Sequence, residues 1–245
     1  MNSRLFCTFV IVCFVLLFVR CEKQPDTLFI LKSADETEIY FNNVVEESDS
    51  FNILSYEYIY NGGGVGIADF NNDGKQDIFF TGNQVPNKLY LNEGNFKFRD
   101  ISDKANVSLP GRWNSGVAVV DINNDGWKDL YVCATTSPDS SLRRNMLFVN
   151  QGLGSTGDPV FKEQAAQYNI DYGGHSIMAA FFDYDRDGDL DLYILENQKL
   201  TNVPTNYRPK ITDGSAANND RLFRNEGNGA FKDVTIEAGI VVEGF

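Results

Sequence analysis

Beyond an N-terminal apolar run, short apolar segments alternate with turns rich in Gly and Asn. Segments this short, rich in Val, Ile, Phe and Tyr, are typical of β-strands rather than helices. The expected strands are Val65–Ala68, Ile78–Phe80, Leu89–Leu91, Phe96–Arg99, Val117–Val120, Leu130–Cys133, Met178–Phe182 and Leu192–Leu195. The stretch Asn92-Glu93-Gly94-Asn95 is expected as the turn of a hairpin. The pattern therefore predicts an all-β fold.

The apolar and polar positions repeat along the chain. Three nine-residue segments, 69–77, 121–129 and 183–191, each have Asp at positions 1, 5 and 9, Asn or Asp at 3 and Gly at 6. Each is followed by a Leu–aromatic pair with an Asn and a Gly, and then by a Phe–basic–acidic triplet. Four strands in a unit of about 50 residues match the size of a propeller blade.

The phase of the repeat also predicts how many blades are present. It places the next loop beyond Phe245, so we expect about three blades and the first half of another, an incomplete β-propeller. The unit varies in length mainly between its last loop Asp and the Leu–aromatic pair, and it is longest in the third copy. We therefore expect Gln198–Asn219 to be a surface excursion.

The N-terminal segment does not belong to the repeats. Arg4 precedes an apolar run from Leu5 to Val19, shorter than the roughly 20 residues that a membrane-spanning helix needs. We predict a signal peptide over residues 1–20 and a tether over 21–36. Cys21 resembles the lipidated first residue of a bacterial lipoprotein. Because Arg20 stands where such signals have a small residue, an uncleaved anchor and an atypically cleaved secretory signal are the alternatives.

The composition excludes some classes of function. The net charge is -13, with 34 Asp+Glu against 21 Lys+Arg, which argues against a nucleic-acid-binding face. Beyond Cys21 only Cys133 remains, so no internal disulfide can hold the 37–245 domain together. Bound cations are the expected substitute.

The three Asp-rich segments have the donor pattern of a calcium loop. Ca²⁺ takes about six to eight oxygen ligands, and Gly at position 6 permits the sharp turn that brings the position-7 carbonyl inward. The expected ligands, for about three Ca²⁺ ions, are Asp69, Asn71, Asp73, Lys75, Asp77, Asp121, Asn123, Asp125, Trp127, Asp129, Asp183, Asp185, Asp187, Asp189 and Asp191, with Lys75, Trp127 and Asp189 acting through backbone carbonyls. An EF-hand is excluded because Phe80, Val132 and Ile194 occupy the position of its bidentate Glu.

These loops, with the blocks that follow them, resemble FG-GAP/VCBS repeats. The resemblance covers about Ile39 to Gly239 and implies an integrin-α-like β-propeller with calcium in the blade hairpins. The runs Tyr58-Ile-Tyr60-Asn61-Gly-Gly-Gly64 and Phe80-Thr81-Gly82-Asn83 are similar to bacterial surface proteins related to cartilage acidic protein. Such proteins often carry a C-terminal ASPIC/UnbV domain, which is not recognisable in this sequence.

Other chemistries are less well supported. His175 is the single histidine, and no triad or zinc partners accompany it, so a strand-end role is the better interpretation. Ser115 and Ser176 lack the Gly-x-Ser-x-Gly elbow of a hydrolase. The run Gly62–Gly66 lacks the Lys of a phosphate loop and indicates close backbone packing instead.

The sequence thus predicts a non-catalytic, calcium-binding module exported to a bacterial cell envelope. Its expected partner is an extracellular protein or glycan, bound through blade-connecting loops, with no nucleic acid and with membrane contact only through the signal or lipid. Trp113 and Trp127 could stack on sugar rings, although blade packing explains them better. The alternatives are a propeller hydrolase or lyase whose active site lies outside these residues, and a purely structural scaffold.

Overall fold

The computed structural model describes residues 27–197 and 209–244. The chain divides into two compact units, Met1–Ser33 and Ala34–Phe245, and every described helix and strand belongs to the second. The predicted signal peptide and Cys21 lie outside the described residues. The described residues include no helix that is long and apolar enough to cross a membrane.

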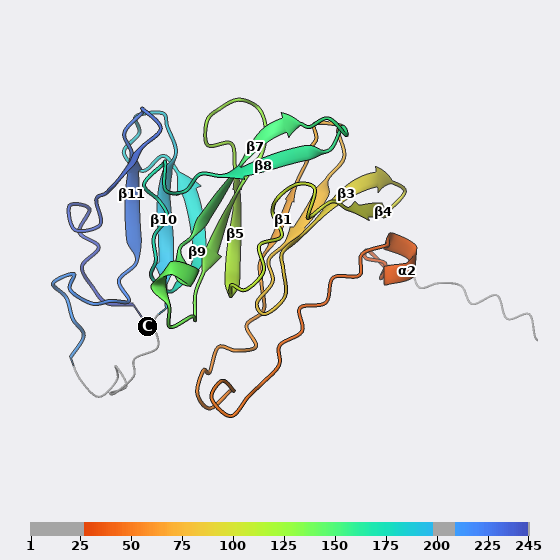
Figure 1. Cartoon of the computed structure of the whole chain (residues 1–245). Coiled ribbons are helices and arrows are strands. Elements are labelled where there is room, and N and C mark those ends of the chain that lie inside the picture. Colours follow the sequence, from red (N-terminus) through yellow and green to blue (C-terminus); the bar gives the residue numbers. More distant parts are fainter. Residues whose placement is uncertain (1–26, 198–208, 245) are drawn as a thin grey trace, which may run out of the picture. The chain divides into compact units, whose positions relative to one another are not determined.

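The described strands form three four-stranded antiparallel sheets, each with the order of its strands in sequence. We call them blades 1, 2 and 3 (Figure 1). Blade 1 holds β1 (Val65–Ala68), β2 (Asp77–Phe80), β3 (Lys88–Gly94) and β4 (Lys97–Asp100); blade 2 holds β5 (Asn114–Val120), β6 (Asp129–Ala134), β7 (Met146–Leu153) and β8 (Pro159–Glu163); blade 3 holds β9 (Ser176–Phe182), β10 (Asp191–Glu196), β11 (Arg221–Asn225) and β12 (Phe231–Asp233). A short helix, α2 (Ala34–Thr37), and a 3₁₀ turn, η1 (Ser140–Arg143), complete the elements.

The all-β prediction and the four-strand unit are confirmed. One detail of the first hairpin was wrong: the chain reverses at Asn95 and Phe96, not over Asn92–Asn95. These two residues have φ of 51° and 58°, and Asn92 instead pairs with Phe98 across a bulge. Asn92 remains in the strand because its backbone and side chain both donate hydrogen bonds to the Asp-rich loop of the same blade, as described below.

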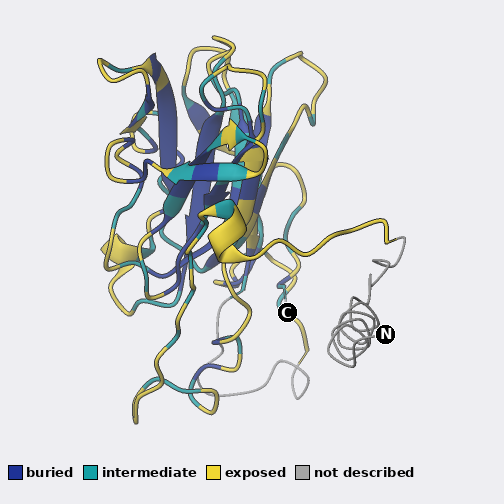
Figure 2. Ribbon diagram, turned by 90° about the vertical axis from the view of Figure 1, so that its right-hand side faces the viewer, coloured by how far each residue is buried: buried dark blue, intermediate teal, exposed yellow. Residues whose placement is uncertain are grey.

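The core lies between neighbouring blades. On β6, Leu130 and Val132 face a cluster shared with blade 1, whereas Tyr131 and Cys133 face a cluster shared with blade 3. All six residues of β6 are buried, while β2 and β10 are buried mainly at alternate positions. Figure 2 shows the resulting pattern, with buried strands and exposed turns. Strand period 2 thus gives the middle blade two apolar faces.

The innermost strands of successive blades lie side by side, β1 against β5 and β5 against β9. Gly64 N–H donates to the carbonyl of Ser115 at 2.8 Å, and Ser115 Oγ donates to the carbonyl of Ser176 at 2.7 Å. A Cβ on Gly116 would lie 2.5 Å from the carbonyl oxygen of Ile177. The predicted role of the Gly-rich run in close backbone packing is consistent with this geometry.

Residues near the end of the chain pack back onto blade 3. The backbone of Gly214 donates to Val241, and that of Glu243 donates to Ile211. No strand is described between residues 234 and 244, so the expected half blade is not seen there. The expected excursion Gln198–Asn219 is described only from residue 209, and Asn219 within it is fully buried. The surface assignment was therefore wrong for its last residues, because they underlie this returning segment.

Candidate metal centres

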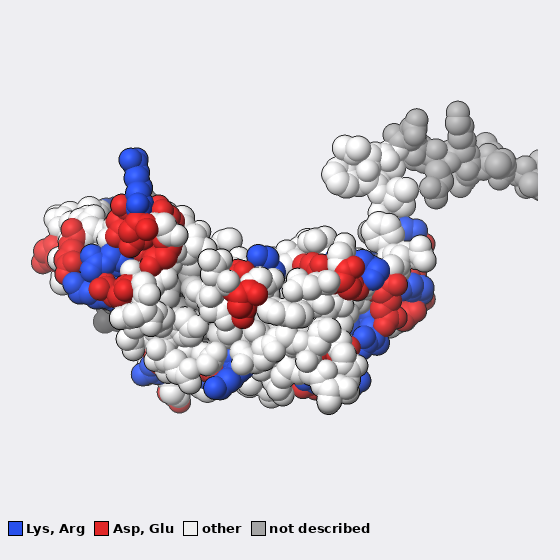
Figure 3. Space-filling model, turned by 90° about the horizontal axis from the view of Figure 1, so that it is seen from above, with Lys and Arg blue, Asp and Glu red and all other residues white. Residues whose placement is uncertain are grey.

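The three Asp-rich loops occupy equivalent places in the blades. Each joins the innermost strand to the second strand, so all three lie at the same end of those strands, the upper end in Figure 1. Viewed toward that end, Asp and Glu side chains form separate groups (Figure 3). The sequence therefore places three candidate cation sites on one face of the module.

The first Asp of each loop organises its turn. Asp69 accepts hydrogen bonds from the N–H groups of Asp73 and Gly74 at 3.1 and 2.7 Å. Asp121 accepts from Asp125 and Gly126, both at 3.0 Å, and Asp183 accepts from Asp187 and Gly188, both at 3.2 Å. The same carboxylate thus holds positions 5 and 6 in all three copies.

The backbone of the loops repeats as well. Gly74, Gly126 and Gly188, at position 6, have φ of 86°, 88° and 99°, a region that favours glycine. Position 4 is also left-handed, although it is Asn, Asn and Arg. The residues and their φ values are Asn72 at 58°, Asn124 at 59° and Arg186 at 68°. The predicted sharp turn at Gly is confirmed, and the turn at position 4 is an addition that the sequence pattern did not reveal.

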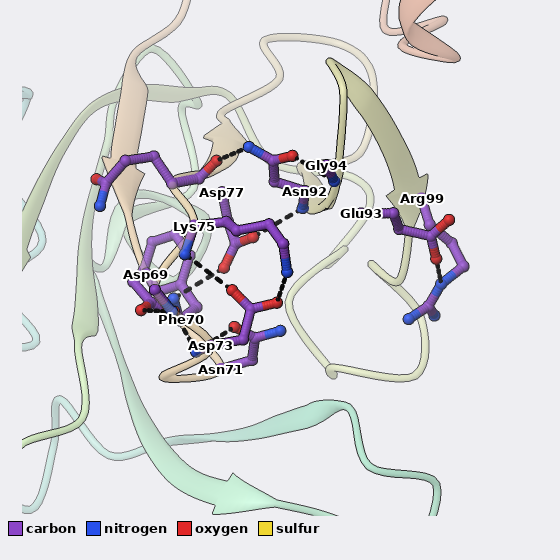
Figure 4. A network of polar contacts seen from close by, with 12 residues as sticks. Asp69, Phe70, Asn71, Asp73, Lys75, Asp77, Asn92, Glu93, Gly94 and Arg99 are labelled. Atoms are coloured by element: carbon purple, nitrogen blue, oxygen red, sulfur yellow. Dashed lines mark hydrogen bonds and ion pairs between the residues drawn. The ribbon is translucent and has the colours of Figure 1, made fainter.

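Positions 3 and 5 form short side-chain-to-backbone turns. Asn71 and Asn123 each accept from the N–H two residues on at 3.2 Å. Asp73, Asp125 and Asp187 each accept from the N–H of position 7, at 2.9, 2.9 and 3.1 Å. Figure 4 shows the first loop, in which Asp69, Asn71 and Asp73 lie around the same turn.

The last Asp of each loop differs from the others because it is fully buried. Asp77, Asp129 and Asp191 each accept two backbone N–H groups, one from position 2 of the loop and one from a following strand. For Asp129 the donors are Ile122 at 2.8 Å and Asn150 at 2.7 Å. The sequence did not distinguish this position, yet it is the one that ties the loop to its sheet.

An Asn that recurs in the block after each loop donates hydrogen bonds to that buried Asp and to the loop backbone. Asn92, Asn150 and Asn225 donate their backbone N–H to the buried Asp, at 2.8, 2.7 and 2.9 Å. Their side-chain Nδ2 donates to the carbonyl of position 8, and their Oδ1 accepts from the Gly two residues on. We call these three residues the clamp asparagines. The recurring Asn-x-Gly after the Leu–aromatic pair was the signal that could have identified them.

The electrostatics of the loops favour a bound cation. Burial, with a smaller contribution from Asp69 and Asp73, raises the pKa of Asp77 to about 6. Burial likewise raises the pKa of Asp129 to about 6, with smaller contributions from Asp125 and Asp121. Both shifts are opposed by backbone hydrogen bonds. A divalent ion would offset the repulsion that contributes to them.

The donor set fits a hard cation such as Ca²⁺, because it consists of carboxylate and amide oxygens. Among the described residues, the third loop is the one where three acidic groups converge: one oxygen each from Asp183, Asp185 and Asp187 lies within 4.8 Å of the others. Desolvation and the neighbouring carboxylate of Asp187 raise the pKa of Asp185. The first two loops have Asn at position 3, so they bring fewer charges together.

Basic side chains distinguish the three loops further. Lys75 Nζ lies 2.7 Å from Asp73 Oδ2, and this hydrogen bond lowers the pKa of Asp73. Lys128 Nζ lies 4.0 Å from Asp121 Oδ2. In the third loop Asp189 stands at the position of Lys75, and its Oδ1 is buried without a hydrogen-bond partner in the structure. We therefore expect the third loop to present the most negative potential of the three.

The other candidate residues take structural roles. The backbone N–H of His175 and the Oγ–H of Ser176 donate to the two carboxylate oxygens of buried Glu196, at 2.6 and 2.7 Å. Burial lowers the pKa of His175 to about 4, so its ring is neutral at physiological pH. Cys133 is buried as a free thiol, and burial raises its pKa. Sequence reasoning did not identify Glu196.

Glu196 predicts a specific pH dependence of stability. Burial raises its pKa from 4.5 to about 7, opposed by Ser176, His175 and Arg221 and reinforced by Asp220. Because the folded state holds the proton more tightly, its stability should fall between pH 4.5 and 7, by about 3 kcal/mol. The lowered pKa of His175 has the opposite effect: it makes the folded state more stable as pH rises from about 4 to 6.5. This contribution is the same in the wild type and in a Glu196 variant.

Chemical denaturation of wild type and Glu196→Gln from pH 5 to 8, in excess calcium, checks this expectation. The loop carboxylates and His175 are the same in both proteins, so their contributions cancel in the difference between the two curves. The wild type should lose stability relative to the variant as pH rises. Parallel curves would show that Glu196 does not titrate in this range.

Comparison with known proteins shows what the chain is similar to. An FG-GAP-like repeat family model matches residues 69–132, from the first loop into β6. Human cartilage acidic protein 1 is 31% identical over 143 residues, which cover 57% of this chain and 21% of that protein. Residues 69–132 thus match an FG-GAP-like repeat. The Xenopus tropicalis cartilage acidic protein 1 is 30% identical over 142 residues, with the same shares. The chain therefore spans about a fifth of the length of these relatives.

Proposed function

We propose that this chain is a calcium-stabilised recognition module of an extracellular protein. One observation carries the calcium part of the proposal: three loops with the same backbone turns, the same oxygen positions and the same buried Asp recur at one end of the blades. The repeated carboxylate and amide oxygens are the donors that a hard cation takes. The similarity to an FG-GAP-like repeat and to cartilage acidic protein 1 supports the extracellular part of the proposal.

Calcium would stabilise the fold by removing repulsion within each loop. Two carboxylates about 4 Å apart repel by roughly 4 kcal/mol at an effective dielectric constant near 20. Each loop ends on a buried Asp that accepts N–H groups from two segments, so an ion bound there would fasten the loop to its sheet. The side chains named above as ligands would hold the ion. The carbonyls of Lys75, Trp127 and Asp189 would complete the set.

Recognition is assigned to the opposite end of the blades. A hollow of about 210 Å³ opens where β1, β5 and β9 begin, and its wall includes Tyr58, Trp113 and Met178. Aromatic walls with a few polar groups suit an extracellular protein or glycan partner. We place attachment to the cell at Cys21. Catalysis has no part in the proposal, because the buried Ser176 and Glu196 form hydrogen bonds with each other, with the backbone of His175 and with the side chain of Asn145.

Thermal unfolding with and without chelator tests the calcium part. If free calcium is about tenfold above each dissociation constant, each site adds about 1.4 kcal/mol. Three sites then correspond to a rise in Tm of roughly 10 °C for a chain of this size. A variant with Asp73→Asn, Asp125→Asn and Asp187→Asn should lose this response, because each loop loses one charged ligand. The three substituted residues are exposed, and the buried Asp of each loop is kept. An equal Tm with calcium and with chelator would refute the calcium role.

A further inference from the structure

The first and second metal loops are joined by an unbroken path of hydrogen bonds. Asp77 Oδ2 accepts the N–H of Phe70 at 2.9 Å, and the carbonyl of Phe70 accepts Asn150 Nδ2 at 2.9 Å. The backbone N–H of Asn150 then donates to Asp129 Oδ1 at 2.7 Å. Three hydrogen bonds thus separate the buried carboxylate of one loop from the buried carboxylate of the next.

The groups along this path have little freedom to move independently. The ring of Phe70 is fully buried between blades 1 and 2 and packs edge-on against Phe161, with ring centroids 6.1 Å apart. Asn150 is 1% exposed, and its Oδ1 is held by Gly152 N–H at 3.0 Å. A second, weaker contact joins the two loops, since Asn72 Nδ2 lies 3.4 Å from the carbonyl of Gly126. Displacement at one loop should therefore reach the other.

The second and third loops have no equivalent connection among the described residues. Asn225 is the clamp asparagine of blade 3, and its Nδ2 donates to Leu190 in its own blade at 3.3 Å. Its backbone N–H binds Asp191 as Asn150 binds Asp129. The same residue type with the same bonds inside its own blade therefore serves as an internal control.

We propose that cation binding at the first loop strengthens cation binding at the second, with Asn150 as the positioning residue that couples them, and that the third loop binds independently. The inference rests on the proposed calcium role. An ion at the first loop fixes Asp77 and with it Phe70, whose carbonyl orients Asn150. Asn150 then presents Asp129 in the geometry that the second ion needs, so part of the ordering is complete before that ion arrives.

Terbium provides the probe, because Trp127 lies in the second loop and can sensitise the luminescence of a Tb³⁺ ion bound there. The other tryptophan, Trp113, lies at the opposite end of the blades. Titration of the whole chain with Tb³⁺ under tryptophan excitation measures the affinity of the second site. The signal that remains in Asp125→Asn, which lacks a ligand of that site, is subtracted as background. The coupling predicts that Asp73→Asn, in the first loop, weakens terbium binding at the second by about fivefold. Asp187→Asn, in the third loop, should change it by less than about twofold.

Asn150→Ala separates the hydrogen-bonded path from simple charge effects. This substitution removes the Nδ2 donor and retains the backbone N–H. If the alanine variant does not fold, Asn150→Asp is used in its place. In that background Asp73→Asn should have no further effect on the second site, whereas in Asn225→Ala it should retain its full effect. An effect of Asp73→Asn that survives in the Asn150 variant, or that Asp187→Asn matches, overturns the coupling. Absence of sensitised luminescence in every protein would instead refute ion binding at the second loop.

Discussion

Asp129→Ala is expected to destabilise the protein by about 2–4 kcal/mol even in excess chelator, since it leaves two backbone N–H groups without an acceptor. Those groups belong to Ile122 and Asn150, and the side chain of Asp129 is fully buried beside them. In calcium the loss should be larger, because the second site also loses a ligand. Denaturant titrations at pH 7.5, above the pKa of about 6 for Asp129, measure both conditions.

Asp125→Ala is the matched control in the same loop. Asp125 is exposed, and its Oδ1 accepts one N–H, that of Trp127 at 2.9 Å. Both substitutions relieve repulsion within the loop, so this favourable term largely cancels between them. Asp125→Ala should cost less than about 1 kcal/mol in chelator and should remove only calcium-dependent stability. Equal losses for the two variants in chelator would mean that the buried Asp has no structural role apart from the metal.

The regular part of the fold could be predicted because the repeat fixes the phase of every strand. The bounds expected for Val65–Ala68 are those observed, and Val117–Val120 lies within the longer β5. β5 begins earlier because Asn114 and Ser115 are polar yet buried. Asn114 N–H bonds the carbonyl of Gly82, and Ser115 Oγ–H bonds that of Ser176, both in neighbouring blades. An apolar pattern along one strand contains no information about such partners.

In the loops, too, local features could be predicted from the sequence and contacts with distant segments could not. Ligand types and the turn at Gly follow from the nine-residue pattern, since local geometry dictates them. The burial of Asp77, Asp129 and Asp191 could not be predicted, because it depends on the strand that follows each loop after a gap of variable length. The bond from Asn150 to Phe70 is less predictable still. The motif places an Asn in all three blades, and only the packing of one blade on the next determines whether its side chain reaches across.

Phe148→Ala is expected to cost about 3–5 kcal/mol, because it opens a cavity in the core between blades 1 and 2. Phe148 is 1% exposed and belongs to the same cluster as Phe70 and Leu130. On β7 it also pairs with Leu130 of β6. Since Phe70 carries the hydrogen bonds from Asp77 to Asn150, loosening this cluster should also weaken the coupling of the first two loops.

Phe96→Ala is the control for this substitution, since the Phe96 side chain is 64% exposed at a hairpin turn. Its removal should change the free energy of unfolding by less than about 0.5 kcal/mol. Denaturant titration of both variants, followed by the terbium titration, measures the two effects together. The expected pattern is a large loss of stability for Phe148→Ala together with a smaller effect of Asp73→Asn on the second site. A cavity variant that loses stability but keeps the full effect of Asp73→Asn would place the coupling outside this core, in the contact between Asn72 and Gly126 instead.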